Sequence, residues 1–208
     1  MAIFDDLEAE QDRLEQILSG LDGAQWATPS AASGWTVADV VLHLAQSEEA
    51  VIASAAGAGL RVGPGSGTTV DQIMDDLVRA EREEPSVIFQ RWREARRGAL
   101  SALRAADPGQ PMSWVEAPLK PATMATTRLA EHWAHGLDIT GPLGIPFPDT
   151  DRLRHVAWLA HRSLPYAFTL AGAFCRVAAQ RLRPEESGLQ SSGPHGAAAL
   201  RLVRTYAA

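Results

Sequence analysis

Apolar residues recur at intervals of three and four along most of the chain, which is the spacing of one buried face of an α-helix. No segment alternates apolar and polar residues strongly enough to predict a sheet, and the sequence has no internal repeat of fixed period. An all-α fold is therefore predicted. Successive helical patterns cover Ile3 to Leu21, Thr36 to Gly57, Thr69 to Ala106 with a break at Pro85, Thr123 to Thr140, and Asp149 to Phe168.

Amphipathic helices joined by short connections predict an up-and-down four-helix bundle. With 208 residues, the chain is long enough for one well-filled core, which we expect in a single domain over residues 1–168. Residues 169–208 are expected to add a short helical C-terminal extension rather than an independent domain. Its helical segments are predicted over Ala171 to Leu182 and Ala197 to Tyr206.

Local start and stop signals mark two of these helices. Thr36 is placed to cap the second helix, and Asp39, three residues later, completes a capping box. Gly141 and Pro142 are expected to end the helix that begins at Thr123, because glycine favours the C-terminal cap and proline cannot continue the hydrogen-bond ladder.

Charge and cysteine content limit the classes of function. A formal net charge of −6 argues against nucleic-acid binding, which needs clustered positive charge, so a small molecule is the expected partner of a monomer or homodimer. No apolar run is long enough to cross a membrane, and the acidic N-terminus lacks the features of a secretion signal, so a cytoplasmic location is expected. Cys175 is the only cysteine, so any metal site must use histidine and carboxylate ligands.

Glu131 and His135 lie four residues apart on a predicted helix, so both side chains project from one face and could hold one ion. On a helical wheel, that face reads as a solvated polar side. The polar side collects Arg128, Glu131, His135 and Asp138, and the apolar side collects Leu129, Trp133 and Leu137. His43 lies at the edge of an apolar stripe on the second helix, where a lone histidine is more often a core residue than a ligand. The residues alone leave a surface pair and a metal site as alternatives.

Two motifs carry a family resemblance. The first is G-W-T-V-A-D-V-V-L-H-L over residues 34–44, and the second is T-T-R-L-A-E-H-W-A-H-G-L-D-I over residues 126–139. Together they resemble the DinB-like metal-binding superfamily, and specifically its mycothiol-dependent maleylpyruvate isomerase branch. The resemblance extends over roughly Phe4 to Phe168 and includes F-Q-R-W-R-E-A-R over residues 89–96.

The resemblance implies that His43, Glu131 and His135 bind one divalent metal ion, with zinc as the expected metal. Three protein ligands leave an open position, as in a catalytic site, and in the resembled branch a low-molecular-weight thiol, mycothiol, takes that position. The ion would lower the pKa of a bound thiol or water, or polarise a carbonyl oxygen. His132 points about 100° away from Glu131 on the helix and is not an expected ligand.

Five further residues are candidates around this site. Asp138 could orient a ligand imidazole or accept its proton, with a solvated aspartate as the alternative. Arg93, Arg96 and Arg128 could each bind a substrate carboxylate through two nitrogens, although each could instead be a surface arginine. Trp114 could form a pocket wall or fill the core.

Longer members of the resembled branch carry an α/β domain after the bundle. Here the chain passes from Phe168 almost directly to A-F-C-R-V-A-A-Q-R, so this region is expected to be shortened. Three functions are therefore open. The first is a metal-dependent thiol S-transferase or thiol-assisted isomerase acting on a small electrophilic or carbonyl substrate. The second is a thiol-independent, metal Lewis-acid isomerase or cyclase, and the third is a non-catalytic metal-binding scaffold.

Overall fold

The computed structural model describes residues 3–58, 70–114, 117–159, 183–188 and 201. The chain divides into two compact units, Met1–Ala157 and Trp158–Ala208. The domain boundary expected between residues 168 and 169 falls outside the described residues and stays a prediction. The first unit contains α1 (Ile3–Ser19), α2 (Gly23–Trp26), α3 (Val37–Ala55), α4 (Val70–Ala80), α5 (Pro85–Ala105) and α6 (Pro121–Leu143); the second contains the short 3-10 helix η1 (Pro184–Glu186).

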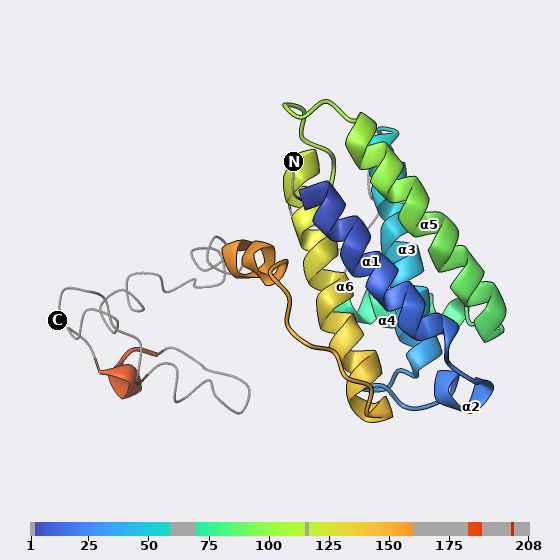
Figure 1. Cartoon of the computed structure of the whole chain (residues 1–208). Coiled ribbons are helices and arrows are strands. Elements are labelled where there is room, and N and C mark those ends of the chain that lie inside the picture. Colours follow the sequence, from blue (N-terminus) through green and yellow to red (C-terminus); the bar gives the residue numbers. More distant parts are fainter. Residues whose placement is uncertain (1–2, 59–69, 115–116, 160–182, 189–200, 202–208) are drawn as a thin grey trace. The chain divides into compact units, whose positions relative to one another are not determined.

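The predicted all-α, DinB-like four-helix bundle is confirmed. The four long helices α1, α3, α5 and α6 lie side by side, and the most extensive contacts join α3 with α5 and α1 with α6 (Figure 1). The described residues contain no strand. Within the same residues, no helix combines the length and the apolar character needed to cross a bilayer.

The up-and-down order predicted for the bundle helices was wrong, because two neighbouring long helices are parallel. Arg91 pairs with Glu49, and further along both helices Gly98 faces Ile52, so α3 and α5 run in the same direction. Two parallel neighbours require a connection that returns along the bundle, and the described part of this connection includes α4. The continuous helical pattern from Thr69 to Ala106 therefore contains one connecting helix and one bundle helix, divided ahead of Pro85 as predicted.

The predicted start of α3 is confirmed. The Thr36 hydroxyl accepts a hydrogen bond from the Asp39 backbone N–H, and the Asp39 carboxylate accepts one from the Thr36 N–H. Arg82 donates two further hydrogen bonds to Asp39, at 2.7 and 2.9 Å. The capping box thus also ties the start of α3 to the segment that follows α4.

The predicted end of α6 was wrong. The helix runs through Pro142 to Leu143 and ends at Gly144, which has a left-handed φ of 64°. Pro142 lacks the backbone N–H that would bond to the Asp138 carbonyl, and that carbonyl instead accepts the Ala31 N–H at 2.9 Å. The proline is tolerated because a loop supplies the missing donor.

The remaining helix predictions are covered only in part. In the segment predicted from Asp149 to Phe168, residues 153–159 are helical and residues 149–152 are not, while the rest lies outside the described residues. The predicted helix from Ala171 to Leu182 also lies outside them, and so does that from Ala197 to Tyr206 except for Arg201.

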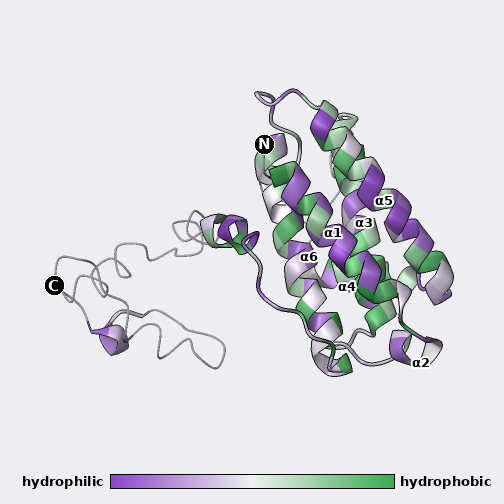
Figure 2. Cartoon of the chain, in the orientation of Figure 1, coloured by the Kyte–Doolittle hydropathy of each residue, from purple (hydrophilic) through white to green (hydrophobic). Residues whose placement is uncertain are grey.

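The bundle core consists of two apolar clusters with a buried polar layer between them. One cluster includes Leu14, Val40 and Ile139, and the other includes Leu7 and Met124. Between these positions, each long helix contributes polar side chains that are buried. These are Gln11 from α1, Glu48 from α3, Arg96 from α5, and Arg128 and His132 from α6. Figure 2 shows that hydrophilic residues also cover the outer sides of α1 and α5.

Candidate metal centre

Three side chains predicted to bind metal converge from two helices. His43 comes from α3, and Glu131 and His135 come from α6, one turn apart. Their ligand atoms all lie within 4.8 Å of one another. Glu131 Oε2 is 3.5 Å from His135 Nε2 and 3.8 Å from His43 Nε2, so the carboxylate lies between the two imidazoles. Two imidazoles and one carboxylate are a donor set that fits zinc.

Asp138 sets the orientation of one imidazole. Its Oδ2 atom lies 2.9 Å from His135 Nδ1. Because a carboxylate accepts hydrogen bonds, this contact places the proton on Nδ1 and leaves Nε2, the nitrogen facing Glu131, as the candidate ligand atom. Asp138 therefore has the geometry of a carboxylate that orients a metal-binding histidine.

The three candidate ligand side chains have shifted pKa values. Burial lowers the pKa of His43, which favours the neutral ligand form. Burial also acts to lower the pKa of His135, but Glu131 and Asp138 raise it above its usual range. The burial of Glu131 would raise its pKa, yet His135, His43 and Arg128 together lower it well below its usual range. At neutral pH the cluster thus presents an ionised carboxylate between two imidazoles.

A pocket of about 600 Å³ opens beside these residues. His43, Glu131 and His135 line it together with Trp35 and α4 residues, including Asp75. The Trp35 ring centroid is 5.1 Å from that of His43, and its indole Nε1 donates a 3.0 Å hydrogen bond to Asp75. An outside molecule can therefore reach the cluster along an aromatic wall.

Sequence reasoning missed Trp35 as a site residue. The signal was present in the G-W-T triplet, where the tryptophan directly precedes the Thr36 cap of the helix that carries His43. The cap fixes where α3 begins, and the residue before it must lie at the helix end nearest the histidine. The contribution of Asp75 and α4 to the pocket carried no comparable local signal.

Arg128 lies behind Glu131 rather than in the pocket. Its side chain is only 4% exposed, its Nη2 atom is 3.7 Å from Glu131 Oε2, and its Nε atom is 3.4 Å from Oε1 of Glu48. The guanidinium carbon of Arg128 also lies over the Trp114 ring, 5.6 Å from its centroid. Burial raises the pKa of Glu48 to about 7, although Arg128 opposes the shift. Arg128 thus lies between Glu131, a candidate metal ligand, and the fully buried carboxyl group of Glu48.

His132 is a core residue, in line with its exclusion from the expected ligands. Its Nδ1 donates to the Arg128 carbonyl at 2.8 Å, and its Nε2 accepts a 3.3 Å hydrogen bond from the Trp92 indole. Burial lowers its pKa to about 3, so the ring is neutral. Both nitrogens are engaged inside the bundle, and neither is available to a metal ion.

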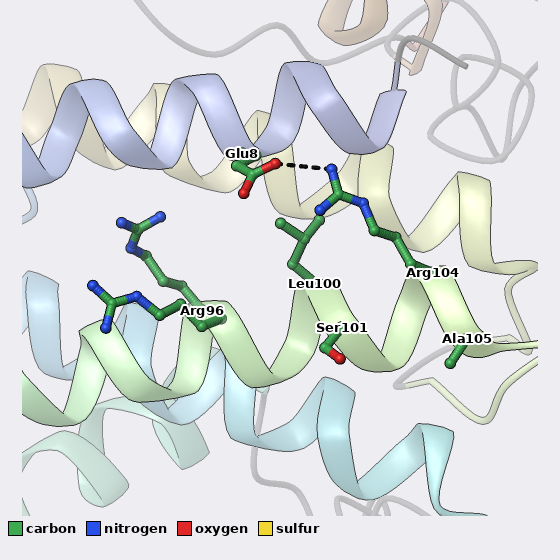
Figure 3. Close-up of a pocket in the computed structure, with 7 residues that line it drawn as sticks. Glu8, Arg96, Leu100, Ser101, Arg104 and Ala105 are labelled. Atoms are coloured by element: carbon green, nitrogen blue, oxygen red, sulfur yellow. Dashed lines mark hydrogen bonds and ion pairs between the residues drawn. The ribbon is translucent and has the colours of Figure 1, made fainter.

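Arg93 and Arg96 lie between α1 and α5. Arg93 binds Glu15, and Arg96 binds both Asp12 and Glu15. Figure 3 shows Arg96 at a separate pocket of about 450 Å³, whose lining also includes Glu8 and Arg104. The structure therefore brings Asp138 and Arg128 to the metal-ligand candidates, and places Arg93 and Arg96 in ion pairs outside the His43 pocket.

The fold and the convergent side chains together define a class of protein: a DinB-like helical bundle with a two-histidine, one-glutamate cluster between its helices. Within this class, the chain belongs to the family described as the mycothiol maleylpyruvate isomerase N-terminal domain, which matches residues 7–140. The matched region contains all three residues of the cluster.

Two relatives support the assignment by sequence. Uncharacterized proteins of Mycobacterium tuberculosis, from strains CDC 1551 and H37Rv, are each 33% identical to the chain over 166 residues. The match covers 78% of this chain and 65% of each relative. The chain thus spans about two thirds of the length of these relatives.

Solved structures support the fold. The crystal structure of a mycothiol-dependent maleylpyruvate isomerase superposes with a TM-score of 0.54 at 14% identity, covering 66% of this chain and 59% of that enzyme. A histidine-to-alanine mutant of the same enzyme gives the same TM-score at 13% identity. At this level of identity the likeness shows a shared bundle, and it carries no statement about substrate.

Proposed function

We propose that this protein is a metal-dependent enzyme of the thiol-assisted isomerase or thiol S-transferase kind, acting on a small electrophilic or carbonyl substrate. The observation that carries the proposal is the convergence of His43, Glu131 and His135 at the wall of a pocket of about 600 Å³. We propose zinc as the ion, because mixed imidazole and carboxylate ligands suit it. Three protein ligands beside a pocket leave room for an outside ligand.

The chain's own residues divide the work at this site. His43 and His135 supply imidazole nitrogens, Glu131 supplies the negative charge, and Asp138 holds the His135 ring with Nε2 toward the pocket. Trp35 lines the pocket beside His43, with the two ring centroids 5.1 Å apart. When bound, the ion lowers the pKa of a coordinated thiol or water, or polarises a carbonyl oxygen, near neutral pH.

Family membership supports a thiol as the outside ligand. The family description names mycothiol, and a thiol whose proton is easily lost is a strong nucleophile toward an electrophilic carbon. Maleylpyruvate and mycothiol are therefore the first probes to use. Because the chain spans only part of its relatives, the thiol and the substrate are both part of the proposal.

Metal analysis tests the first half of the proposal. Elemental analysis of the purified protein is expected to give about one zinc ion per chain. H43A and H135A should each lose most of this metal. H155A is a matched control, because His155 is another partly buried histidine whose ring nitrogen pairs with a carboxylate, that of Asp6. Equal metal content in H43A and H155A would reject the site.

Activity measurements test the second half. Turnover with a small thiol and an electrophilic substrate should be present in the wild type and in H155A, and lost in H43A. Full activity in thiol-free buffer would instead favour the Lewis-acid isomerase or cyclase. Bound metal with no small molecule that competes for its open position would favour the non-catalytic scaffold.

A further inference from the structure

Glu48 and Arg128 are two ionisable side chains in the bundle interior, and neither belongs to the cluster of candidate metal ligands. The Glu48 side chain is 0% exposed and the Arg128 side chain is 4% exposed. An arginine keeps its charge under all ordinary conditions, so its burial requires a negative partner. Arg128 has one such partner on each side, Glu48 deeper in the core and Glu131 at the pocket.

Arg128 contacts both Glu48 and Glu131. Nε lies 3.4 Å from Glu48 Oε1, and Nη2 lies 3.7 Å from Glu131 Oε2. Neither nitrogen has a hydrogen-bond partner among the described residues, and neither do the two carboxylate oxygens of Glu48. The Arg128 guanidinium therefore faces the two carboxyl groups at ion-pair distance, without closer hydrogen bonds from these atoms.

Stability alone is a weak reason to bury such a pair. Moving two charges out of water is costly, and well-packed apolar side chains at the same positions often give an equally stable or more stable protein. The position of the pair is the informative feature. Arg128 precedes Glu131 by one turn of α6 and contacts the carboxylate oxygen that lies between His43 and His135.

We propose that Glu48 and Arg128 are positioning residues for the metal ligand Glu131. Arg128 holds the Glu131 carboxylate against the two imidazoles, and Glu48 fixes the Arg128 guanidinium from within the core. A carboxylate on a flexible, 43% exposed side chain would otherwise swing toward solvent. This inference rests on the proposed metal site, and it adds that the site is supported from behind by a buried ion pair.

The test compares metal affinity with the stability of the metal-free protein. In the double variant E48L/R128M, both charges are replaced by apolar side chains, so the metal-free protein should unfold at the same denaturant concentration as the wild type or a higher one. Its zinc affinity, measured by competition with a chelator, should still fall by about 10- to 100-fold. A purely structural pair predicts the opposite result, with zinc affinity preserved wherever stability is preserved.

R128K provides a second measurement that keeps a buried positive charge opposite Glu48. Lysine lacks the forked guanidinium that can face two carboxylates at once, so zinc affinity should fall between those of the wild type and the double variant. Wild-type affinity in R128K would overturn the proposal even if the double variant failed to fold.

R96M is the matched control. Arg96 is also buried, pairs with carboxylates and lies 5.3 Å from a tryptophan ring, but its partners are Asp12 and Glu15 on α1. R96M should lower stability and leave zinc affinity unchanged. If wild-type protein binds no zinc, the proposed metal site itself fails; if it binds zinc and the Arg128 variants bind equally well, only the positioning role fails.

Discussion

Gly136 and Phe147 approach so closely that a Cβ atom on residue 136 would lie 2.6 Å from the Cζ atom of Phe147. The glycine is therefore required by the space that the aromatic ring occupies. The Phe147 ring also lies 3.5 Å from the guanidinium carbon of Arg13, so it cannot move without losing that contact. The contact between Gly136 and Phe147 therefore holds the segment after α6 against α6 itself, the helix that carries Glu131 and His135.

G136A is expected to destabilise the protein by about 1–3 kcal/mol, the usual effect of overpacking, even though alanine is the better helix former. In an F147A background the same substitution should be neutral or stabilising, because the clash is gone. Urea denaturation of the four proteins in this double-mutant cycle measures the difference. An equal cost of G136A in both backgrounds would contradict the close contact.

D138A is expected to weaken zinc binding by about 10- to 100-fold, because His135 loses the partner that orients its ring. D138N should give an intermediate value, since its amide oxygen can still accept the Nδ1 proton but carries no charge. Competition titration gives both affinities, and denaturation of the metal-free variants controls for a loss of fold. Unchanged affinity in D138A would show that the ring is held in place by other contacts.

Zinc affinity should fall as the pH is lowered, in two stages. Metal binding requires neutral imidazoles, and the pKa of His135 is raised while that of His43 is lowered. Affinity should therefore fall by about tenfold per pH unit once the pH drops below the pKa of His135, because one proton competes. At lower pH, where His43 also becomes protonated, two protons compete with the metal, so the fall in zinc affinity should steepen to about 100-fold per pH unit.

Zinc titrations between about pH 5 and pH 8 would measure this profile, with the pH limits taken as about 1.5 units either side of the ordinary histidine pKa. D138A serves as the control, since loss of Asp138 should move the first stage to lower pH. A two-proton slope from the start would show that the two imidazoles titrate together.

D39N is expected to destabilise the protein by about 1–2 kcal/mol at neutral pH, because it weakens charge-assisted hydrogen bonds. Burial acts to raise the pKa of Asp39, but Arg82 and Thr36 lower it overall. The ionised form is therefore favoured by folding. Its contribution is present above the unfolded pKa of about 3.9 and is lost as the pH falls through the lower, folded value.

Denaturation of wild type and D39N at neutral pH and at acid pH checks this prediction. The difference between the two proteins should be largest at neutral pH and should shrink in acid. R82Q should show part of the same pattern, since it removes the ion pair and leaves the Thr36 capping box in place. A difference that does not change with pH would mean that the charge of Asp39 is unimportant.

Features of the fold that depend on local chemistry could be predicted from the sequence. The Thr36 and Asp39 capping box is complete within four residues, and the break before Pro85 follows from the missing backbone donor. The direction of α5 could not be predicted in the same way. Whether α4 or α5 joins the bundle depends on which of them packs against α3 along its whole length, and that is a tertiary property.

The face of α6 that lies inside the bundle was predicted only in part from the helical wheel. Leu129 is buried as expected, but Arg128 on the expected polar side is buried and Leu137 on the expected apolar side is 42% exposed. The wheel assumes that burial follows apolar character, but here Glu48 and Trp92 supply partners for buried polar groups of α6. Polar residues with partners on other helices cannot be recognised from one helix alone.

The metal-ligand candidates show the same limit. Helical spacing could pair Glu131 with His135, whereas the approach of His43 from α3 depends on how two distant helices pack. Family resemblance supplied that third residue. Trp35 lay within the quoted motif, but only its 5.1 Å approach to the His43 ring gives it a place at the site.

The Ala31 hydrogen bond that replaces the donor missing at Pro142 has a mechanical consequence. The chain from Ala31 continues directly into Ser33 and Trp35, which line the pocket, and the accepting carbonyl belongs to Asp138, whose side chain orients His135. Thermal displacement of α6 would therefore move the segment of Ser33 and Trp35 together with the His135 imidazole. The distance between Trp35 and His135 in the pocket should therefore stay constant while the surrounding helices fluctuate.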